Sequence, residues 1–175
     1  LMRRRLRLPR FDNAVWPIRP DRAMTRLPAL DPAHQLSTTL KFCVVHAGLV
    51  LDAPGSAAWL VTGACALAQQ AAVLALTAAG DTIPAQAGAG ELLLRAASKD
   101  RLPPPYTLPF TASARRDFDR LIESRNKFMH PRGITWHVCP DTVASGLLVV
   151  TASVRHLLLT QPVTADLVPN SHRNG

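Results

Sequence analysis

An arginine, an asparagine and a histidine stand close together in the stretch ESRNKFMHPRG, residues 123–133. Arg125 carries a fixed positive charge, and its planar fork fits the oxygens of a phosphate or a carboxylate. The imidazole of His130 exchanges protons near neutral pH, which suits it to general acid and base catalysis. Asn126 lies four residues before His130, so in a helix its amide can hydrogen-bond the imidazole or tether Arg125. These residue types indicate a site that binds an anion and moves a proton.

The residues before this stretch predict an amphipathic helix whose apolar side also carries the arginine. Its apolar stripe consists of Phe118, Leu121, Ile122 and Met129, and Arg125 falls on the same stripe. Arginine is almost never fully buried unless it is paired. Either its stem packs and its head reaches water, or the stripe borders a cleft or a second subunit where the guanidinium meets an anion. Pro131 disfavours helical geometry at His130, so the chain is expected to turn out at the histidine.

The hexapeptide RNKFMH, residues 125–130, resembles the Arg-polar-x-x-x-His signature of the HEPN superfamily. This superfamily comprises small helical domains of prokaryotic RNase toxins and other RNA-cutting systems. Arg125 matches the arginine of the signature, Asn126 its frequent polar neighbour and His130 its histidine. The resemblance covers roughly residues 31–161, and it implies a bundle of four or five helices that acts as a metal-independent endoribonuclease without a cofactor. RNA is then the substrate, a toxin or defence role is expected, and an antitoxin protein is a candidate partner.

The chemistry of RNA cleavage agrees with these residue types. Without a metal, the 2′-hydroxyl of the RNA can act as nucleophile, one group accepts its proton and another protonates the departing 5′-oxygen. Histidine suits both roles, and arginine stabilises the charge that develops on the phosphoryl group. One motif supplies one histidine, whereas in the family two subunits face each other across one cleft. A homodimer is therefore expected, with Arg125 and His130 of both copies in the cleft.

Other polar residues near the motif have two interpretations each. The candidates for RNA binding are Arg116, Arg120, Lys127 and Arg132. They form either a rim that follows phosphates or a solvated face with helical ion pairs. His46 is expected to be a core or interface histidine, and His137 is a weaker candidate for the cleft. Ser124 precedes the motif without the acid–histidine pattern that a serine nucleophile needs.

The elements that must position the motif are expected to be helices joined by proline-rich connections. Asp31 and Pro32 start a helix that runs to about Asp52, and Ser56 caps the next, which ends at Gly80. The further expected elements are a short helix over residues 91–100, the motif helix capped by Thr111 or Ser113, an extended piece ITWHV, and a last helix capped by Asp141 with Val143, Leu147, Val150, Val154 and Leu157 on one stripe. The fold class is therefore all-α, with an irregular basic arm over residues 1–30, a helical domain over 31–161 and a tail over 162–175.

The net charge of +8 is concentrated at the N-terminal end of the chain. Residues 1–26 hold eight arginines and two aspartates, a balance of +6, and the rest of the chain has a balance of +2. This arm could bind nucleic acid or act as a solvating tail. Cys43, Cys65 and Cys139 lack the spacing of zinc ligands, so no metal site is expected. Each cysteine is expected to be a small apolar residue of the core. A reducing, cytoplasmic location follows.

Two alternatives to the ribonuclease hypothesis remain at this point. The first is a non-catalytic HEPN-like module that binds nucleotide, RNA or a protein partner. In a ribonuclease Arg125 and His130 should meet across a dimer cleft open to solvent, whereas in such a module each should be satisfied separately. The second is a small membrane-associated helical protein, because residues 57–80 are long enough to span a bilayer. Gln69 and Gln70 lie in the middle of that stretch and much of it is alanine, so a buried bundle helix without membrane contact is the favoured interpretation.

Overall fold

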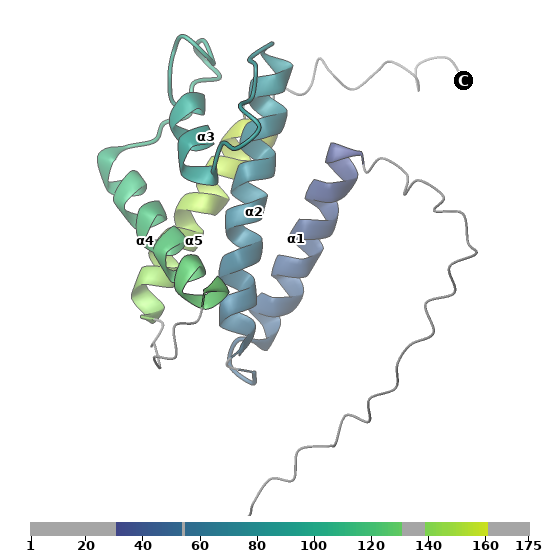
Figure 1. Ribbon diagram of the computed structural model, residues 1–175, viewed down its shortest axis with the longest axis vertical. Coiled ribbons are helices and arrows are strands. Elements are labelled where there is room, and N and C mark those ends of the chain that lie inside the picture. Colours follow the sequence, from purple (N-terminus) through teal and green to yellow (C-terminus); the bar gives the residue numbers. More distant parts are fainter. Residues whose placement is uncertain (1–30, 54, 131–138, 161–175) are drawn as a thin grey trace, which may run out of the picture.

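The computed structural model describes residues 31–53, 55–130 and 139–160, and every regular element in these ranges is helical (Figure 1). In chain order these elements are α1 (Pro32–Leu49), α2 (Gly55–Ala78), α3 (Ala89–Ala96), α4 (Ala112–Met129), α5 (Pro140–Arg155) and a π-helical turn, η1 (His156–Thr160). The expected all-helical bundle is therefore confirmed. The basic arm, the ITWHV piece and the C-terminal tail lie outside the described residues.

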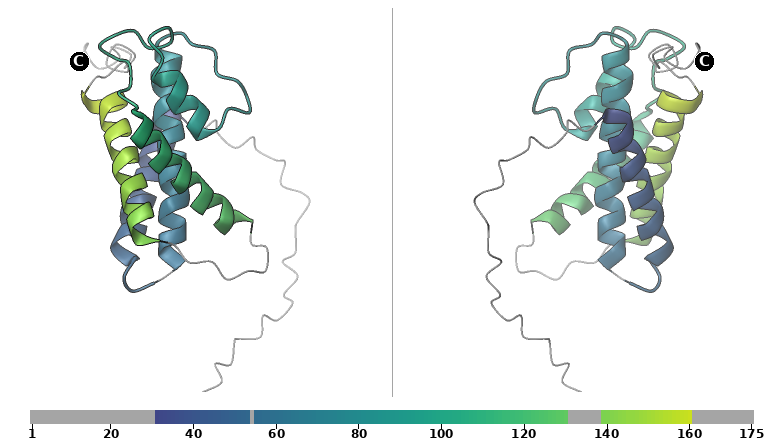
Figure 2. Two further views of the ribbon diagram at one scale, coloured as in Figure 1. Left: turned by 90° about the vertical axis from the view of Figure 1, so that its left-hand side faces the viewer. Right: turned by 90° about the vertical axis from the view of Figure 1, so that its right-hand side faces the viewer.

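The central element of the bundle is α2, against which α1, α3, α4 and α5 all pack (Figures 1 and 2). Its face toward α3, α4 and α5 is built from small side chains. Ala68, Ala71, Ala72 and Ala75 recur at helical spacing and have no exposed surface. Small residues let neighbouring helices approach closely, so one helix can serve as the core of four others.

Two helical stretches are long and apolar enough to cross a membrane, Gly55–Ala78 and Pro140–Leu159. In the first, 61% of the most apolar window is buried inside the bundle, and in the second 22% is buried. Length and composition alone do not separate a membrane span from the core helix of a soluble protein. The prediction that residues 57–80 form a buried bundle helix agrees with the position of α2 among its neighbours.

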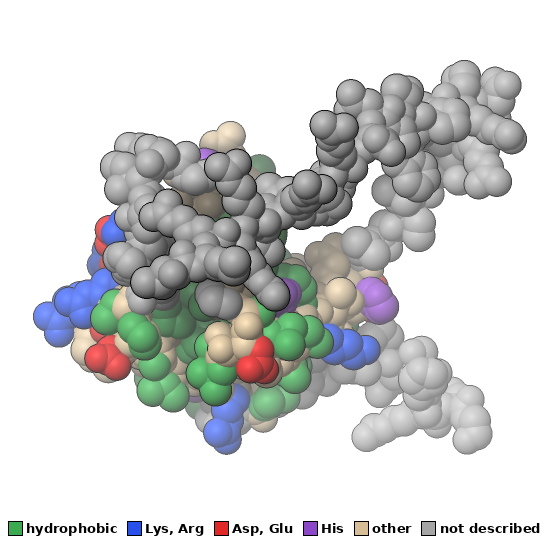
Figure 3. Space-filling view, turned by 90° about the horizontal axis from the view of Figure 1, so that it is seen from below, with side chains coloured by type: hydrophobic (Ala, Val, Ile, Leu, Met, Phe, Trp, Pro, Cys, Tyr) green, Lys and Arg blue, Asp and Glu red, His purple; other side chains and the backbone are tan. Residues whose placement is uncertain are grey.

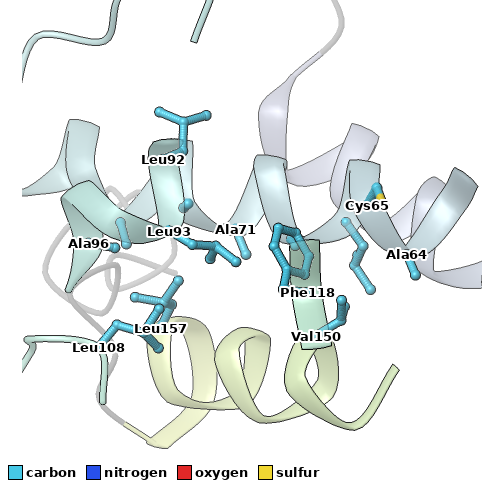
Figure 4. Packing of buried hydrophobic residues seen from close by; sticks show 14 of the residues in the cluster. Ala64, Cys65, Ala71, Leu92, Leu93, Ala96, Leu108, Phe118, Val150 and Leu157 are labelled. Carbon is cyan, nitrogen blue, oxygen red and sulfur yellow. The ribbon is translucent and has the colours of Figure 1, made fainter. Parts of the chain in front are cut away.

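The core gathers around Phe118 of α4 (Figure 4). Its ring is completely buried and lies between Ala71 of α2 and Val150 of α5. Phe110 adds an edge-on ring contact with a centroid distance of 6.3 Å. Burying a phenylalanine contributes roughly 1.5–3 kcal/mol to folding, so this contact fixes α4, and with it the motif, against the bundle.

The helix boundaries agree with the predicted caps where the signal is local. Asp31 caps α1 by accepting a hydrogen bond from the Ala33 amide, and Thr111 caps α4 by accepting one from the Ala114 amide. Gly80 follows two residues after the end of α2 and has a φ of +80°, a left-handed conformation that favours glycine and stops the helix. The expected stripe from Val143 to Leu157 faces the core, although its last residue, Leu157, lies in η1 rather than in α5.

Three boundary predictions are wrong. Ser56 does not cap α2, because the helix already includes Gly55 and the serine is buried in its first turn. Asp141 lies inside the first turn of α5, since Pro140 takes the first helical position and Cys139 is the N-cap. The short helix begins at Ala89 and ends at Ala96 rather than spanning 91–100, because the chain turns after it to bring Leu102 into the core.

A buried ion-pair cluster anchors the loop between α2 and α3. The Asp81 side chain is 4% exposed and accepts hydrogen bonds of 2.8–3.2 Å from Arg95, with a further bond of 2.8 Å from Arg101. Arg95 also donates to the Thr82 carbonyl at 3.0 Å. Burial by itself raises the pKa of Asp81, but the hydrogen bonds and charges of Arg95 and Arg101 outweigh it and hold that pKa below its usual range.

We expect the replacement Asp81→Asn to lower the melting temperature at pH 7, because it leaves Arg95 without a carboxylate partner. The folded-state pKa lies below the unfolded value of about 3.9, so the stabilisation is complete above that value and is lost as pH falls through the lower folded pKa. The difference in melting temperature between wild type and variant should therefore shrink below pH 4. Thermal melts at pH 7 and pH 3 test this, and an undiminished difference at the lower pH would contradict it.

Candidate functional site

The motif lies at the C-terminal end of α4, at the lower end of the bundle in Figure 1. The helix ends at Met129, and His130 is its C-cap with φ −127° and ψ 68°, outside helical geometry. Pro131 follows, and a proline disfavours the helical conformation of the residue before it. The backbone amide of His130 still donates to the Asn126 carbonyl at 3.0 Å, so the expected turn-out at the histidine is confirmed.

Arg125 is half-buried, and its guanidinium is tied to the neighbouring amide. Nη1 of Arg125 donates to Oδ1 of Asn126 at 3.1 Å, so of the two expected roles of Asn126 the structure shows the tether. Among the described residues, no carboxylate pairs with this arginine. Burial raises the pKa of the Cys65 thiol to about 11, and the positive charge of Arg125 acts against that increase. The guanidinium therefore lies near α2, and no acidic group in the described part of the chain compensates its charge.

Arg125 lines a cavity of about 440 Å³ that no single element forms. Its walls are Thr62, Cys65, Ala66 and Gln69 of α2, residues 85–90 before and at the start of α3, and Ile122, Arg125 and Asn126 of α4. The wall from the α3 loop is held partly by Gln69, whose Nε2 donates to the Ala87 carbonyl at 3.3 Å. The arginine on the apolar stripe thus borders a hollow, which was one of the two interpretations of its spacing.

His130 does not line this cavity, although Asn126, four residues earlier on α4, does. The His130 side chain is exposed, and it makes no hydrogen bond with any described residue. Next to it, Phe128 of α4 meets Trp59 of α2 edge-on, with the ring centroids 5.2 Å apart. Met129 is 44% exposed although it falls on the predicted apolar stripe, because the C-terminal part of α4 leans away from α5 (Figure 2).

The basic residues around the motif are divided between paired and unpaired groups. Lys127 contacts Glu123 at 2.6 Å and Arg120 contacts Asp117 at 3.7 Å, and all four side chains lie on α4. These are the helical ion pairs of the solvated-face interpretation, and such exposed pairs contribute little to stability. Arg116 is exposed without an ion pair among the described residues. Arg132 and His137 lie outside the described residues.

The two remaining candidates take non-catalytic positions. His46 contacts Phe42 of α1 in a tilted arrangement with a centroid distance of 4.3 Å, and its Nδ1 is buried without a partner in the described part of the chain. Ser124 donates to the Arg120 carbonyl one turn earlier at 3.0 Å. Sequence reasoning missed Cys65, Gln69 and the 85–90 loop. Of these, Gln69 carried a usable signal, a polar residue inside an apolar helix.

Comparison with known proteins adds no relative to this picture. No family model matches the chain, and no curated protein sequence or solved structure is significantly similar to it. Within the described residues, no group of three or more histidine, cysteine, aspartate or glutamate side chains is placed to hold a metal ion. The end of α4 and the cavity lined by Arg125 are therefore the features of this chain that point to a function.

Proposed function

We propose that this protein is a metal-independent endoribonuclease of the HEPN type. The observation that carries the proposal is Arg125, which is tied by Asn126, lacks an acidic partner among the described residues, and stands one turn before the exposed His130. A half-buried guanidinium without a carboxylate favours an external anion. An exposed imidazole at a helix end is free to reach a substrate proton.

In the proposed reaction, His130 accepts the proton of the 2′-hydroxyl of RNA. The 2′-oxygen then forms a bond to the adjacent phosphorus, and the bond from phosphorus to the 5′-oxygen breaks. A second histidine protonates the departing 5′-oxygen, which leaves a 2′,3′-cyclic phosphate and a 5′-hydroxyl. Arg125 stabilises the negative charge that develops on the phosphoryl oxygens, where its planar fork makes two hydrogen bonds.

The second histidine is proposed to come from a second copy of the chain. Exposed apolar side chains support this, since Met129 of the motif is 44% exposed, Trp59, which contacts Phe128, is 45% exposed, and Leu51 of the α1–α2 connection is 94% exposed. Figure 3 looks at this end of the bundle, and hydrophobic side chains make up much of its described surface. Exposed apolar patches of this kind mark sites of protein association. A two-fold dimer through this end brings two copies of His130 and Arg125 together.

The direct test is cleavage of a mixed RNA substrate by the purified protein with excess EDTA present. We expect the cleavage rate to be unchanged by the chelator, because proton transfer by His130 and charge stabilisation by Arg125 need no metal ion. The His130→Ala protein, purified in the same way, measures contaminating nuclease. Activity that disappears in EDTA and returns with added magnesium would overturn the mechanism.

One observation favours a second candidate function. Within one chain, His130 does not line the cavity that Arg125 borders, so a single copy has a binding site without a reacting group. A non-catalytic HEPN-like module that binds nucleotide, RNA or a protein partner fits that arrangement. Binding of RNA without any cleavage, by a protein that sediments as a monomer, would select this alternative. The toxin or defence role, the antitoxin partner and the cytoplasmic location remain proposals that follow from the ribonuclease hypothesis.

A further inference from the structure

We propose that the cavity between α2, α4 and the 85–90 loop holds one base of the RNA, so that cleavage is selective for the nucleotide whose phosphate lies on Arg125. This inference builds on the proposed function, since it assigns the substrate feature that the same site recognises. It depends on the shape of the cavity and on the hydrogen-bonding groups that remain unused in its walls.

The shape and wall chemistry suit a planar, partly apolar group. The cavity has a volume of about 440 Å³ and is open to solvent, and Gln69 and Asn126 in its walls are exposed. Ala66, Ala87 and Ile122 provide apolar surface for the faces of a ring. Sequence-specific recognition of RNA commonly takes an unstacked base into such a pocket and reads its edge there.

The polar groups of the walls offer both donors and an acceptor. Nε2 of Gln69 donates to the Ala87 carbonyl, which leaves Oε1 as an acceptor. Oδ1 of Asn126 accepts from Arg125, which leaves the two N–H groups of the Asn126 amide as donors. A base edge carries donors and acceptors side by side, and amide side chains are suited to reading it.

The charged groups around the cavity indicate where the phosphate and the base of the nucleotide bind. A side-chain carbon at Gly90 would lie 3.9 Å from Oδ1 of Asp119, so a carboxylate stands close to the α3 end of the cavity. Asp119 is exposed and contacts Arg115 at 3.8 Å, but its carboxylate still offers acceptors for the amino group of a base and no donor for a phosphate. Arg125 lines the cavity six residues further along α4, about 9 Å along the helix axis, and has no acidic partner among the described residues. The phosphate is therefore assigned to Arg125 and the base to the side of the α3 loop.

Gly88 allows the cavity to be filled without disturbing the fold. Its φ of −79° and ψ of 164° are extended values that any residue adopts, and a side-chain carbon there meets no atom within 4 Å. The replacement Gly88→Leu therefore places an isobutyl group at the cavity wall. Gly48→Leu is the matched control, because Gly48 of α1 is equally open and does not line the cavity. Gln69→Leu is a second variant that removes the free acceptor and keeps the volume of the side chain.

The experiment measures binding of the four ribonucleoside 3′-monophosphates to the full-length His130→Ala protein, with and without each substitution, by calorimetry. One nucleotide is expected to bind about tenfold or more tightly than the weakest, as a pair of base-edge hydrogen bonds provides. Gly88→Leu and Gln69→Leu should each remove that preference, and Gly48→Leu should retain it. Equal binding of all four nucleotides, or a preference that survives both cavity variants, would overturn the inference.

The cleavage pattern of a random RNA separates this inference from the proposed function. If wild-type protein cuts without base preference and Gly88→Leu cuts in the same way, the base pocket is wrong and the ribonuclease stands. If no RNA is cut although one nucleotide binds selectively and Gly88→Leu abolishes the selectivity, the ribonuclease is wrong and the pocket stands. Circular dichroism melts of each variant show that loss of binding does not come from unfolding.

Discussion

Replacing His130 by alanine is expected to reduce RNA cleavage by ~10²–10⁴-fold, because the loss of a general acid or base costs that much in rate. The side chain is exposed and makes no hydrogen bond with any described residue. Its removal should therefore change the free energy of unfolding by no more than about 0.5 kcal/mol. Single-turnover cleavage rates and RNA affinity, measured on the same preparation, test this, and affinity should be nearly unchanged.

The neighbouring residues of the motif provide graded controls for that result. Arg125→Lys should also be severe although it keeps the charge, since lysine lacks the planar fork that grips a phosphoryl group. Asn126→Ala should be milder, because it removes the 3.1 Å tether on the guanidinium and no reacting group. His46→Ala is expected to cleave at close to the wild-type rate. If His46→Ala proved as damaging as His130→Ala in an equally folded protein, the assignment of the reacting histidine would be wrong.

The second large effect concerns stability. Phe118→Ala is expected to lower the free energy of unfolding by ~3–5 kcal/mol, the usual cost of removing a buried phenylalanine ring and leaving a cavity. Whole domains are stable by only about 5–15 kcal/mol, so this single change should bring the bundle close to unfolding. The ring is completely buried between α2 and α5. Urea denaturation followed by circular dichroism measures the loss.

Phe110→Ala is the matched control for this prediction. Phe110 meets the same ring at a centroid distance of 6.3 Å, but it lies in the connection before α4 and is only half-buried. Its replacement should lower the free energy of unfolding clearly less than that of Phe118, because the half-buried Phe110 ring has less apolar surface shielded from water. Equal losses from the two variants would show that the aromatic pair, and not the core position of Phe118, fixes α4.

The sequence by itself determined the features that depend on a few adjacent residues. Asp31 with Pro32 and Thr111 start helices because each side chain caps amides one turn away, and Pro131 ends α4 because it restricts His130. The composition of α2 likewise predicted a buried helix, since Gln69 and Gln70 interrupt its apolar stretch and much of the rest is alanine. The motif residues, their order along α4 and the exposed histidine at its end follow from the same local rules.

Only the tertiary structure decided where those residues meet the rest of the chain. The cavity beside Arg125 combines α2, α4 and the 85–90 loop, and no local pattern brings such distant segments together. The same packing left Met129 exposed at the end of α4, against the prediction of its stripe, and turned the chain after Ala96 to bury Leu102. The physical reason is that capping acts over one helical turn, whereas burial is decided by which helices lie opposite one another.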